Sequence, residues 1–192
     1  MLFEATESDA NQSMAYAILG MLRRMQVRLA ESRIALDKAI TLDPNSELGN
    51  RQLAWTLLFL AEPDAAIARG EKCLRLSPRD SYIFGTYQLI GWSHLVSNRL
   101  DAAIEWFIKG CTTHPRIWTF YYGLAGALAL KGDLDGAKAA LAESLKLRPE
   151  VNSVAQWYEY LPCTSKANNP QYWALEDKTL TEGLRRIGFP EN

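Results

Sequence analysis

The sequence has few of the residues on which catalysis and metal binding depend. Its 192 residues include two histidines and three cysteines, and no two cysteines form a CxxC pair. It contains no HExxH, GxxxxGK, GxSxG or GxGxxG motif. His94 and His114 have no serine or carboxylate at a pairing spacing, so both are expected to be packed or surface histidines. We therefore predict no catalytic residue, no cofactor and no metal site, and keep a small enzyme on a helical scaffold as a remote alternative.

The chain also lacks an excess of positive charge and a long apolar run. Its 21 Lys and Arg residues against 22 Asp and Glu residues give a net charge of -1, which argues against a nucleic-acid partner. The longest apolar stretch, 53–61, is too short to span a bilayer, and the first twelve residues do not resemble a signal peptide. Cys73, Cys111 and Cys163 lie far apart, and Cys73 and Cys111 are read as small core residues in a reducing compartment. We expect a cytoplasmic protein without a membrane partner.

Four prolines recur at a nearly fixed spacing. Pro44 and Pro78 are 34 residues apart, Pro115 and Pro149 are also 34 apart, and the gap between the two pairs is 37. A period near 34 indicates an array of helical repeats. The odd gap places three extra residues at 79–81, before the third repeat. Such an array offers an extended surface rather than a convergent pocket.

The residues before each proline follow one register. Small residues stand twelve positions before the prolines, at Ser32, Ala66, Ala103 and Ala137, and five positions before them, at Ala39, Cys73, Gly110 and Ser144. Larger residues mostly stand eight positions before them, at Leu36, Gly70, Phe107 and Leu141. Small residues allow two helices to approach closely, and the large ones fill the space between them.

The pattern resembles the tetratricopeptide repeat (TPR), a helix–turn–helix unit of 34 residues. The resemblance is carried by the prolines, by the aromatics Tyr16, Tyr87 and Tyr121, and by the pairs Leu19-Gly20, Leu53-Ala54, Ile90-Gly91 and Leu124-Ala125. It covers residues 13–149, and the second repeat departs from it at Asn50 and Gly70. The resemblance implies an all-α, right-handed superhelix (α-solenoid) of antiparallel helix pairs with about ten helices.

This register divides the chain into an N-terminal extension, four repeats and a tail. The extension is 1–12, the repeats are 13–46, 47–80, 84–117 and 118–151, and the tail is 152–192. The predicted helices of the first two repeats are 13–26, 29–42, 46–60 and one that starts at 62–64. Those of the last two repeats are one that ends near 97, one that starts at 98–101 and ends near 114, then 118–131, and one that ends near 147. In the tail, 153–161 is expected to be the helix of a degenerate repeat, 162–170 a loop, and 171–187 an amphipathic capping helix.

The first helix of each repeat lines the concave side in the family that the pattern resembles. This resemblance gives the candidate partner-binding residues Met21, Arg24, Arg51, Trp55, Leu58, Gln88, Trp92, Leu95 and Tyr122. Trp55 and Trp92 hold equivalent positions in successive repeats, and stiff aromatic side chains are common binding hot spots. Arg51, one turn before Trp55, is expected to grip a carboxylate of the bound segment. The Lys and Asn clamp of relatives that bind C-terminal carboxylates is absent.

Two alternatives for this groove stay open at the level of sequence. Both tryptophans could belong to the core between helices, or the helix at 171–187 could fold back into the concave face and cover them. Residues 1–12 are too few to cap the first helix fully, so a partner or a second copy is expected to cover the N-terminal end, as in a homodimer, unless the chain was cut from something longer.

Several longer strings carry a narrower resemblance. ITLDPNSELGNRQLAWTLLFLAEPDAAI, GWSHLVSNRLDAAIEW and LTEGLRRIGFPEN are similar to the C-terminal TPR regions of bacterial class III adenylate cyclase-like signalling proteins. That resemblance implies a regulatory arm beside a cyclase or a DNA-binding domain, neither of which is in this chain. The first functional hypothesis remains a protein-interaction module that binds a peptide or helix in the groove. The regulatory arm is the alternative.

Overall fold

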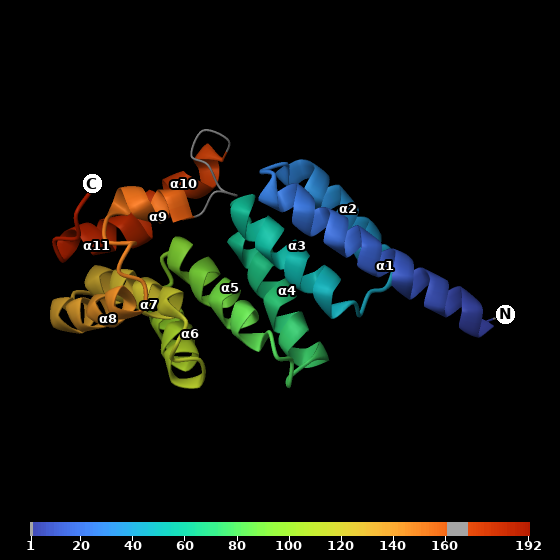
Figure 1. The fold of residues 1–192 in the computed structure, drawn as a ribbon, viewed down its shortest axis with the longest axis horizontal. Coiled ribbons are helices and arrows are strands. Elements are labelled where there is room, and N and C mark those ends of the chain that lie inside the picture. The colour runs from blue at the N-terminus through green and yellow to red at the C-terminus, as the bar shows by residue number, and fades with distance from the viewer. Residues whose placement is uncertain (1, 161–168) are drawn as a thin grey trace.

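The computed structural model describes residues 2–160 and 169–192, in which every regular element is helical (Figure 1). Four antiparallel pairs follow one another: α1 (Leu2–Met25) with α2 (Leu29–Leu42), α3 (Glu47–Phe59) with α4 (Pro63–Leu76), α5 (Ile83–Val96) with α6 (Leu100–Thr113), and α7 (Trp118–Lys131) with α8 (Leu134–Leu147). The tail adds α9 (Val154–Tyr160), α10 (Pro170–Glu176), the π-helical segment η2 (Asp177–Thr181) and α11 (Glu182–Arg186). The segments α10, η2 and α11 are continuous and form one C-terminal helix, residues 170–186. The described residues therefore form ten helices, which confirms the predicted all-α solenoid.

Most helix boundaries agree with the prediction to within one or two residues, because prolines and cap residues set them locally. Ser46 accepts a hydrogen bond from the Gly49 amide at the start of α3, and Asp133 does the same for Gly136 at the start of α8. Pro63 occupies the first turn of α4, where its missing N–H costs nothing. The loop expected at 162–170, with Cys163, lies for the most part outside the described residues.

The N-terminal helix is longer than predicted. It begins at Leu2 rather than near Ser13, so the backbone of most of the expected extension continues α1. Residues 2–12 contain no proline or glycine, and the acidic residues there favour a helix N-terminus. The division of the chain into extension, repeats and tail remains a prediction.

The turn inside each repeat uses a residue in the left-handed region. Val27, Ala61, Asn98 and Gly132 hold equivalent positions in the four repeats, with φ of 59°, 59°, 56° and 95°. The spacing set by the prolines is therefore repeated in the backbone conformation of these turns. Only the fourth repeat places a glycine there, which is the residue that adopts this conformation without strain.

Replacing Gly132 by valine is expected to lower the free energy of unfolding by about 1–2 kcal/mol, the cost of a left-handed β-branched residue. A methyl group at Gly132 would meet nothing within 4 Å, so the loss would come from the backbone alone. Urea unfolding followed by circular dichroism measures it. Gly132→Asn is the matched control, because asparagine tolerates this region. Equal losses in the two variants would contradict the explanation.

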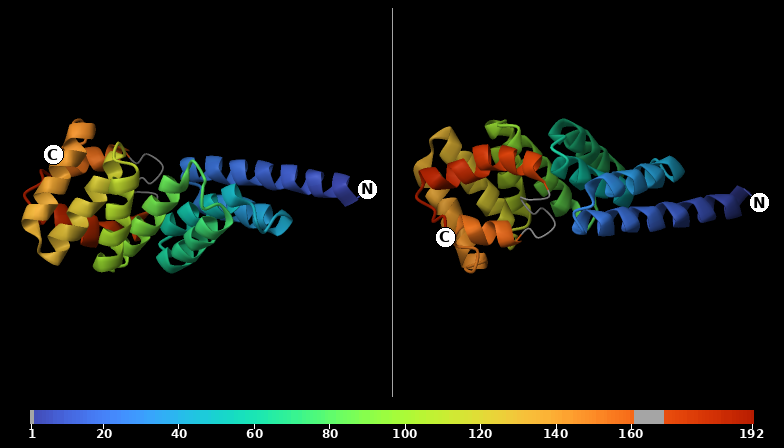
Figure 2. Two further views of the ribbon diagram at one scale, coloured as in Figure 1. Left: turned by 90° about the horizontal axis from the view of Figure 1, so that it is seen from below. Right: turned by 90° about the horizontal axis from the view of Figure 1, so that it is seen from above.

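The C-terminal helix lies against the first helices of the later repeats. Its segments η2 and α11 contact α5 and α7, and none of the second helices of the repeats is among its main neighbours (Figure 2). We call the side formed by α3, α5 and α7 the inner face. Leu180 and Leu184 are fully buried there. The tail helix therefore covers the inner face of repeats three and four, which settles one of the alternatives left open by the sequence.

Close approach of this helix depends on two glycines. A methyl carbon at Gly126 of α7 would lie 2.6 Å from Leu180 Cδ1, and one at Gly183 would lie 2.9 Å from the Gly126 carbonyl carbon. The end of the chain is also fixed, because the amides of Val154 and Ala155 donate to backbone carbonyls at 190 and 191, at 2.9 and 3.0 Å. The tail is thus an integral part of the solenoid.

An aromatic cavity on the inner face as the candidate functional site

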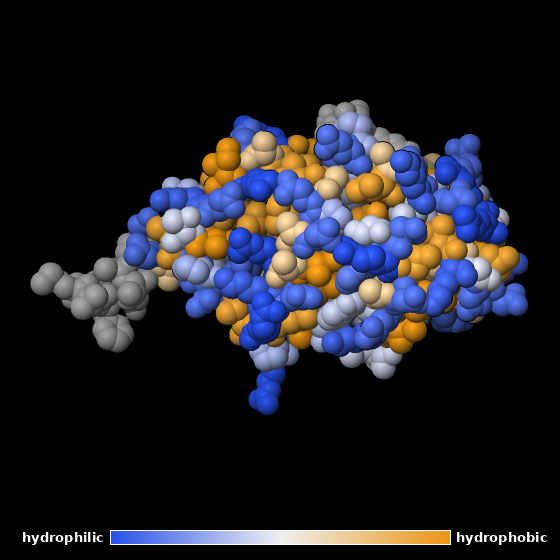
Figure 3. Space-filling model, turned by 180° about the vertical axis from the view of Figure 1, so that it is seen from behind, coloured by the Kyte–Doolittle hydropathy of each residue, from blue (hydrophilic) through white to orange (hydrophobic). Residues whose placement is uncertain are grey.

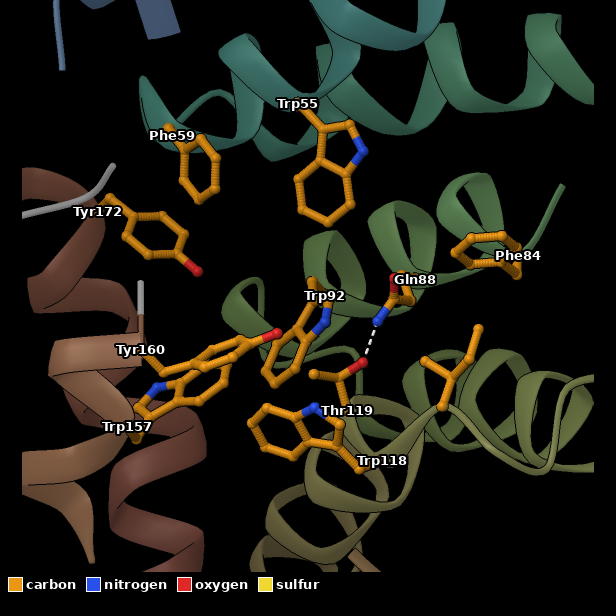
Figure 4. A pocket seen from close by; sticks show the side chains of 11 residues that line it. Trp55, Phe59, Phe84, Gln88, Trp92, Trp118, Thr119, Trp157, Tyr160 and Tyr172 are labelled. Carbon is orange, nitrogen blue, oxygen red and sulfur yellow. Dashed lines mark hydrogen bonds between the residues drawn. The ribbon is translucent and has the colours of Figure 1, made fainter. Parts of the chain in front are cut away.

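Beside the C-terminal helix, the inner face is hollowed by a cavity of about 430 Å³. Aromatic rings from five helices converge on it (Figure 4): Trp55 and Phe59 of α3, Phe84 and Trp92 of α5, Trp118 of α7, Trp157 and Tyr160 of α9, and Tyr172 of α10. Gln88, Ile117 and Thr119 complete the lining. No acidic or basic side chain is among these eleven residues.

The repeat register and the tail build this cavity together. Trp55 and Trp92 are 37 residues apart and hold equivalent places on α3 and α5, and Phe59 lies one turn after Trp55. The α9 helix then places Trp157 over Trp92, with ring centroids 5.5 Å apart and planes at 21°. Tyr160 packs edge-on against the α7 tryptophan at 4.8 Å. One wall therefore comes from the array and the other from the tail.

The two tryptophans singled out by sequence differ in exposure. Trp92 is 5% exposed, because Trp157 covers one face of its ring and Phe107 packs edge-on at 5.3 Å. Trp55 is half-buried, and its ring partner is Phe59 at 5.9 Å. The core alternative therefore describes Trp92, while Trp55 keeps part of its indole available at the cavity.

Polar groups in the lining are sparse. The Gln88 amide donates a hydrogen bond to the Thr119 hydroxyl across α5 and α7 (Figure 4). Apolar rings make up most of the remaining surface, and such surfaces gain free energy when water leaves them. The cavity is thus suited to an apolar or aromatic group, with Gln88 and Thr119 as its directional polar contacts.

Arg51 already pairs with two carboxylates of its own chain. Its guanidinium pairs with Glu47 and, at 2.6 Å, with Asp80, and it lies over the Tyr82 ring at 5.5 Å. These contacts connect α3 to the loop before α5, and Arg51 is only 12% exposed in its side chain. Burial raises the pKa of the Glu47 carboxyl, while the Arg51 charge lowers it. The loop of three extra residues thus brings Asp80 to Arg51, and a grip on a partner's carboxylate stays a prediction.

The other candidates are spread between surface and core. Arg24 donates to Gln52 at 3.0 Å and lies over the Phe59 ring at 5.8 Å, and Met21 is partly exposed on α1. Leu58, Leu95 and Tyr122 are fully buried. The structure thus brings Trp55, Gln88 and Trp92 together in the cavity and leaves the other six outside its lining. Partner binding by these six residues stays a prediction.

The tail contributes cavity residues that sequence reasoning missed. They are Trp157, Tyr160 and Tyr172, and the array adds Phe59, Phe84, Ile117, Trp118 and Thr119. The available signal was the density of aromatic residues at 157–173, which exceeds what a helix that only caps an array needs.

A buried carboxylate joins the two tail helices beneath the cavity. Glu176 is fully buried and accepts hydrogen bonds from Trp157 Nε1 at 2.6 Å and from the Thr181 hydroxyl at 2.8 Å. Burial and the nearby Glu176 charge raise the pKa of Tyr122 well above its ordinary value. Asn169, the residue directly before α10, donates a hydrogen bond to the Phe59 carbonyl at 2.7 Å. These bonds hold both the α9 wall and the start of the C-terminal helix in position.

The remaining chemistry-bearing side chains are packed. Burial raises the pKa of the Cys73 and Cys111 thiols to about 12, so both stay protonated near neutral pH. Burial lowers the pKa of His94, and His114 packs against the Phe84 ring at 5.5 Å. Within residues 2–160 and 169–192, no group of three or more His, Cys, Asp or Glu side chains could hold a metal ion. No helix in the same residues is long and apolar enough to cross a membrane.

Comparison with known proteins supports the tetratricopeptide assignment. Residues 89–152 match the family model described as tetratricopeptide repeat. The chain is similar to the crystal structure of MamA (TM-score 0.63, 18% identity, covering 91% of this chain and 93% of that one). It is also similar to YrrB, described as a TPR protein with an unusual peptide-binding site (0.61, 16%, 96% and 91%), and to PilF of Pseudomonas aeruginosa (0.65, 20%, 92% and 78%). Comparison with curated proteins gave no match. The fold is that of TPR solenoids.

Proposed function

We propose that the protein is an interaction module that binds an extended segment of a partner protein through the aromatic cavity. The observation that carries the proposal is the convergence of eight aromatic rings on one cavity of about 430 Å³ without a charged side chain in its lining. Stiff aromatic side chains offer a large contact area at low entropic cost. One large apolar or aromatic side chain of the partner would enter the cavity and displace water.

The position of the C-terminal helix favours an extended segment over a long bound helix. Its segments η2 and α11 occupy the inner face along α5 and α7. The part left open lies between α3, α5 and the α9 wall, where Trp55 is half-buried. A partner helix laid along the whole inner face would have to displace Leu180 and Leu184, at a cost of about 1.5–3 kcal/mol for each side chain exposed.

The proposed activity is binding rather than catalysis, and we place it in the cytoplasm. The net charge of -1 provides no general attraction for nucleic acid. The description of YrrB as peptide-binding shows that a protein of this fold serves such a role. In the alternative of a regulatory arm in a bacterial cyclase or transcriptional signalling system, the partner segment would belong to the signalling protein. No contact in the described residues favours that alternative over a general interaction module.

Peptides selected by display against the wild-type protein test the proposal. Replacing Trp55 by alanine is expected to weaken binding of the selected peptides by about 2 kcal/mol, a roughly thirtyfold rise in Kd. Fluorescence polarisation with a labelled peptide measures it. The selected peptides should share one aromatic or large aliphatic residue, and replacing that residue by alanine should cause a similar loss.

Trp106→Ala is the matched control for this experiment. Trp106 is also a half-buried tryptophan, but it lies on α6, packs on Tyr87 at 5.6 Å and does not line the cavity. Its loss should leave peptide affinity unchanged. Equal affinity of the wild type and the Trp55→Ala variant, in proteins with the same helix content, would overturn the proposal.

A further inference from the structure

The N-terminal helix carries an apolar stripe that no part of the described chain covers. Met14, Ile18, Leu22 and Met25 are 56%, 41%, 46% and 58% exposed. Their spacing of four, four and three residues places them on one side of α1, which is separate from the side that packs on α2 and α3. Figure 1 shows α1 at the outer end of the array, and Figure 3 shows that hydrophobic residues reach the surface among hydrophilic ones on the opposite face of the molecule.

The repeat register shows what kind of surface this is. The equivalent positions are Leu48, Gln52, Thr56 and Phe59 in α3, Gly85, Leu89, Ser93 and Val96 in α5, and Thr119, Gly123, Ala127 and Leu130 in α7. Nine of these twelve are buried, because the preceding repeat packs on them, and the other three are partly buried. The stripe on α1 therefore has the place of an inter-repeat contact, but no repeat packs on it within the described residues. A repeat face that is left uncovered needs a polar outer surface, and the stripe is apolar.

We propose that a second copy of this chain covers the stripe, with the two α1 helices packed antiparallel about a two-fold axis. Such an axis makes one surface its own partner, and the stripe offers the same apolar residues from both sides. This inference concerns a surface separate from the aromatic cavity and does not depend on the proposed function.

The charge along α1 selects the antiparallel orientation. Among the described side chains, the first half of the helix carries Asp9 and no basic residue, whereas the region around its end carries Arg23 and Arg28, which share one carboxylate, Glu31. Antiparallel packing brings the acidic half of each copy beside the basic end of the other. Parallel packing would bring like charges together, which costs free energy at a partly desolvated contact.

The length of α1 supports the same arrangement. With 24 residues it is ten residues longer than α2, and its residues 9–11 are all exposed (Figure 2). A helix segment that buries little apolar surface is marginally stable in water. A second α1 helix alongside would add to the burial that α2 is too short to give.

Analytical ultracentrifugation of the whole chain tests the pairing. The weight-average mass should rise from 21.6 kDa toward twice that value as the concentration is raised. Ile18→Glu and, separately, Met14→Lys should shift the equilibrium toward the monomer by at least tenfold in Kd. Both side chains are exposed in the single chain, so a charge there leaves the monomer folded, which circular dichroism checks. A chain that stays monomeric at every concentration would overturn the proposal, as would dimers unaffected by both changes.

Ile34→Glu is the matched control, because Ile34 is 71% exposed on α2 and outside the stripe. It should dimerise like the wild type. Asp9→Arg tests the orientation, since it should weaken an antiparallel dimer by placing like charges at the basic end of the partner. A tighter dimer of Asp9→Arg would contradict antiparallel packing. Masses that grow beyond the dimer would contradict closed two-fold pairing.

Discussion

Replacing Phe107 by alanine is expected to lower the free energy of unfolding by about 3–5 kcal/mol. Phe107 of α6 is fully buried and inserts between α5 and α7. A methyl carbon at Gly91 of α5 would lie 2.8 Å from its ring, and one at Gly123 of α7 would lie 2.5 Å from it. Because these two neighbours are glycines, neither has a side chain to move into the space that the ring leaves, and Trp92, which also contacts the ring, is held by stacking on Trp157. The space left by the Phe107 ring should therefore persist at close to full size.

The adjacent Ile108 provides the control for this prediction. It lies on the same helix but is 50% exposed, so Ile108→Ala removes apolar surface without opening a cavity. Its expected loss is below about 1 kcal/mol. Chemical unfolding followed by circular dichroism compares the two variants. A loss of less than 1 kcal/mol in Phe107→Ala would mean that α5 and α7 collapse onto the vacated space, and would contradict rigid packing around Phe107.

Phe107 also shows why the array could be predicted from sequence. It stands eight residues before Pro115, where the register expects a large residue, and Gly110 stands five residues before the same proline, where it expects a small one. A methyl carbon at Gly110 would collide with the ring of Phe120 in the next helix. Such contacts join neighbours in the chain and recur with one period, so counting residues is sufficient to find them. The helix boundaries were predictable for the same reason.

The aromatic cavity could be predicted only in part. The register gave one wall, because Trp55 and Trp92 hold equivalent positions on neighbouring helices. The other wall depends on Trp157 and on the bond from its indole nitrogen to Glu176, and neither residue belongs to a repeated pattern. A contact that occurs once leaves no period to count. At the level of sequence, the position of the C-terminal helix on the inner face is therefore one of two alternatives.

Arg51 illustrates a second limit of sequence reasoning. The register places it one turn before Trp55, but it does not show which carboxylate pairs with the guanidinium. Asp80 belongs to the segment that carries the three extra residues, where the period is broken. Its carboxylate lies 2.6 Å from Arg51. Residues in such irregular loops decide whether a basic side chain is free to bind a partner.

Replacing Gly183 by alanine is expected to lower the free energy of unfolding by about 3 kcal/mol, the upper end for overpacking. A methyl carbon there would lie 2.9 Å from the Gly126 carbonyl carbon and still closer to its oxygen. Backbone atoms cannot rotate away as a side chain can, so α11 and α7 must separate. Gly85→Ala is the control, because a methyl carbon at Gly85 meets nothing within 4 Å. It should cause no loss of stability.

The free-energy costs of overpacking and of helix release predict that α11 separates locally from α7 in this variant. The C-terminal helix as a whole is not expected to be released. Full release would expose Trp173, Leu180 and Leu184, at about 1.5–3 kcal/mol each, and would also break the buried bonds of Glu176. That total exceeds the cost of overpacking at one methyl group. Hydrogen exchange should therefore quicken across 182–188 in Gly183→Ala, while 170–176 keeps the protection seen in the wild type. Loss of protection along the whole helix would show that its two ends act as one unit, and that the contacts of Glu176 do not hold the first half in place independently.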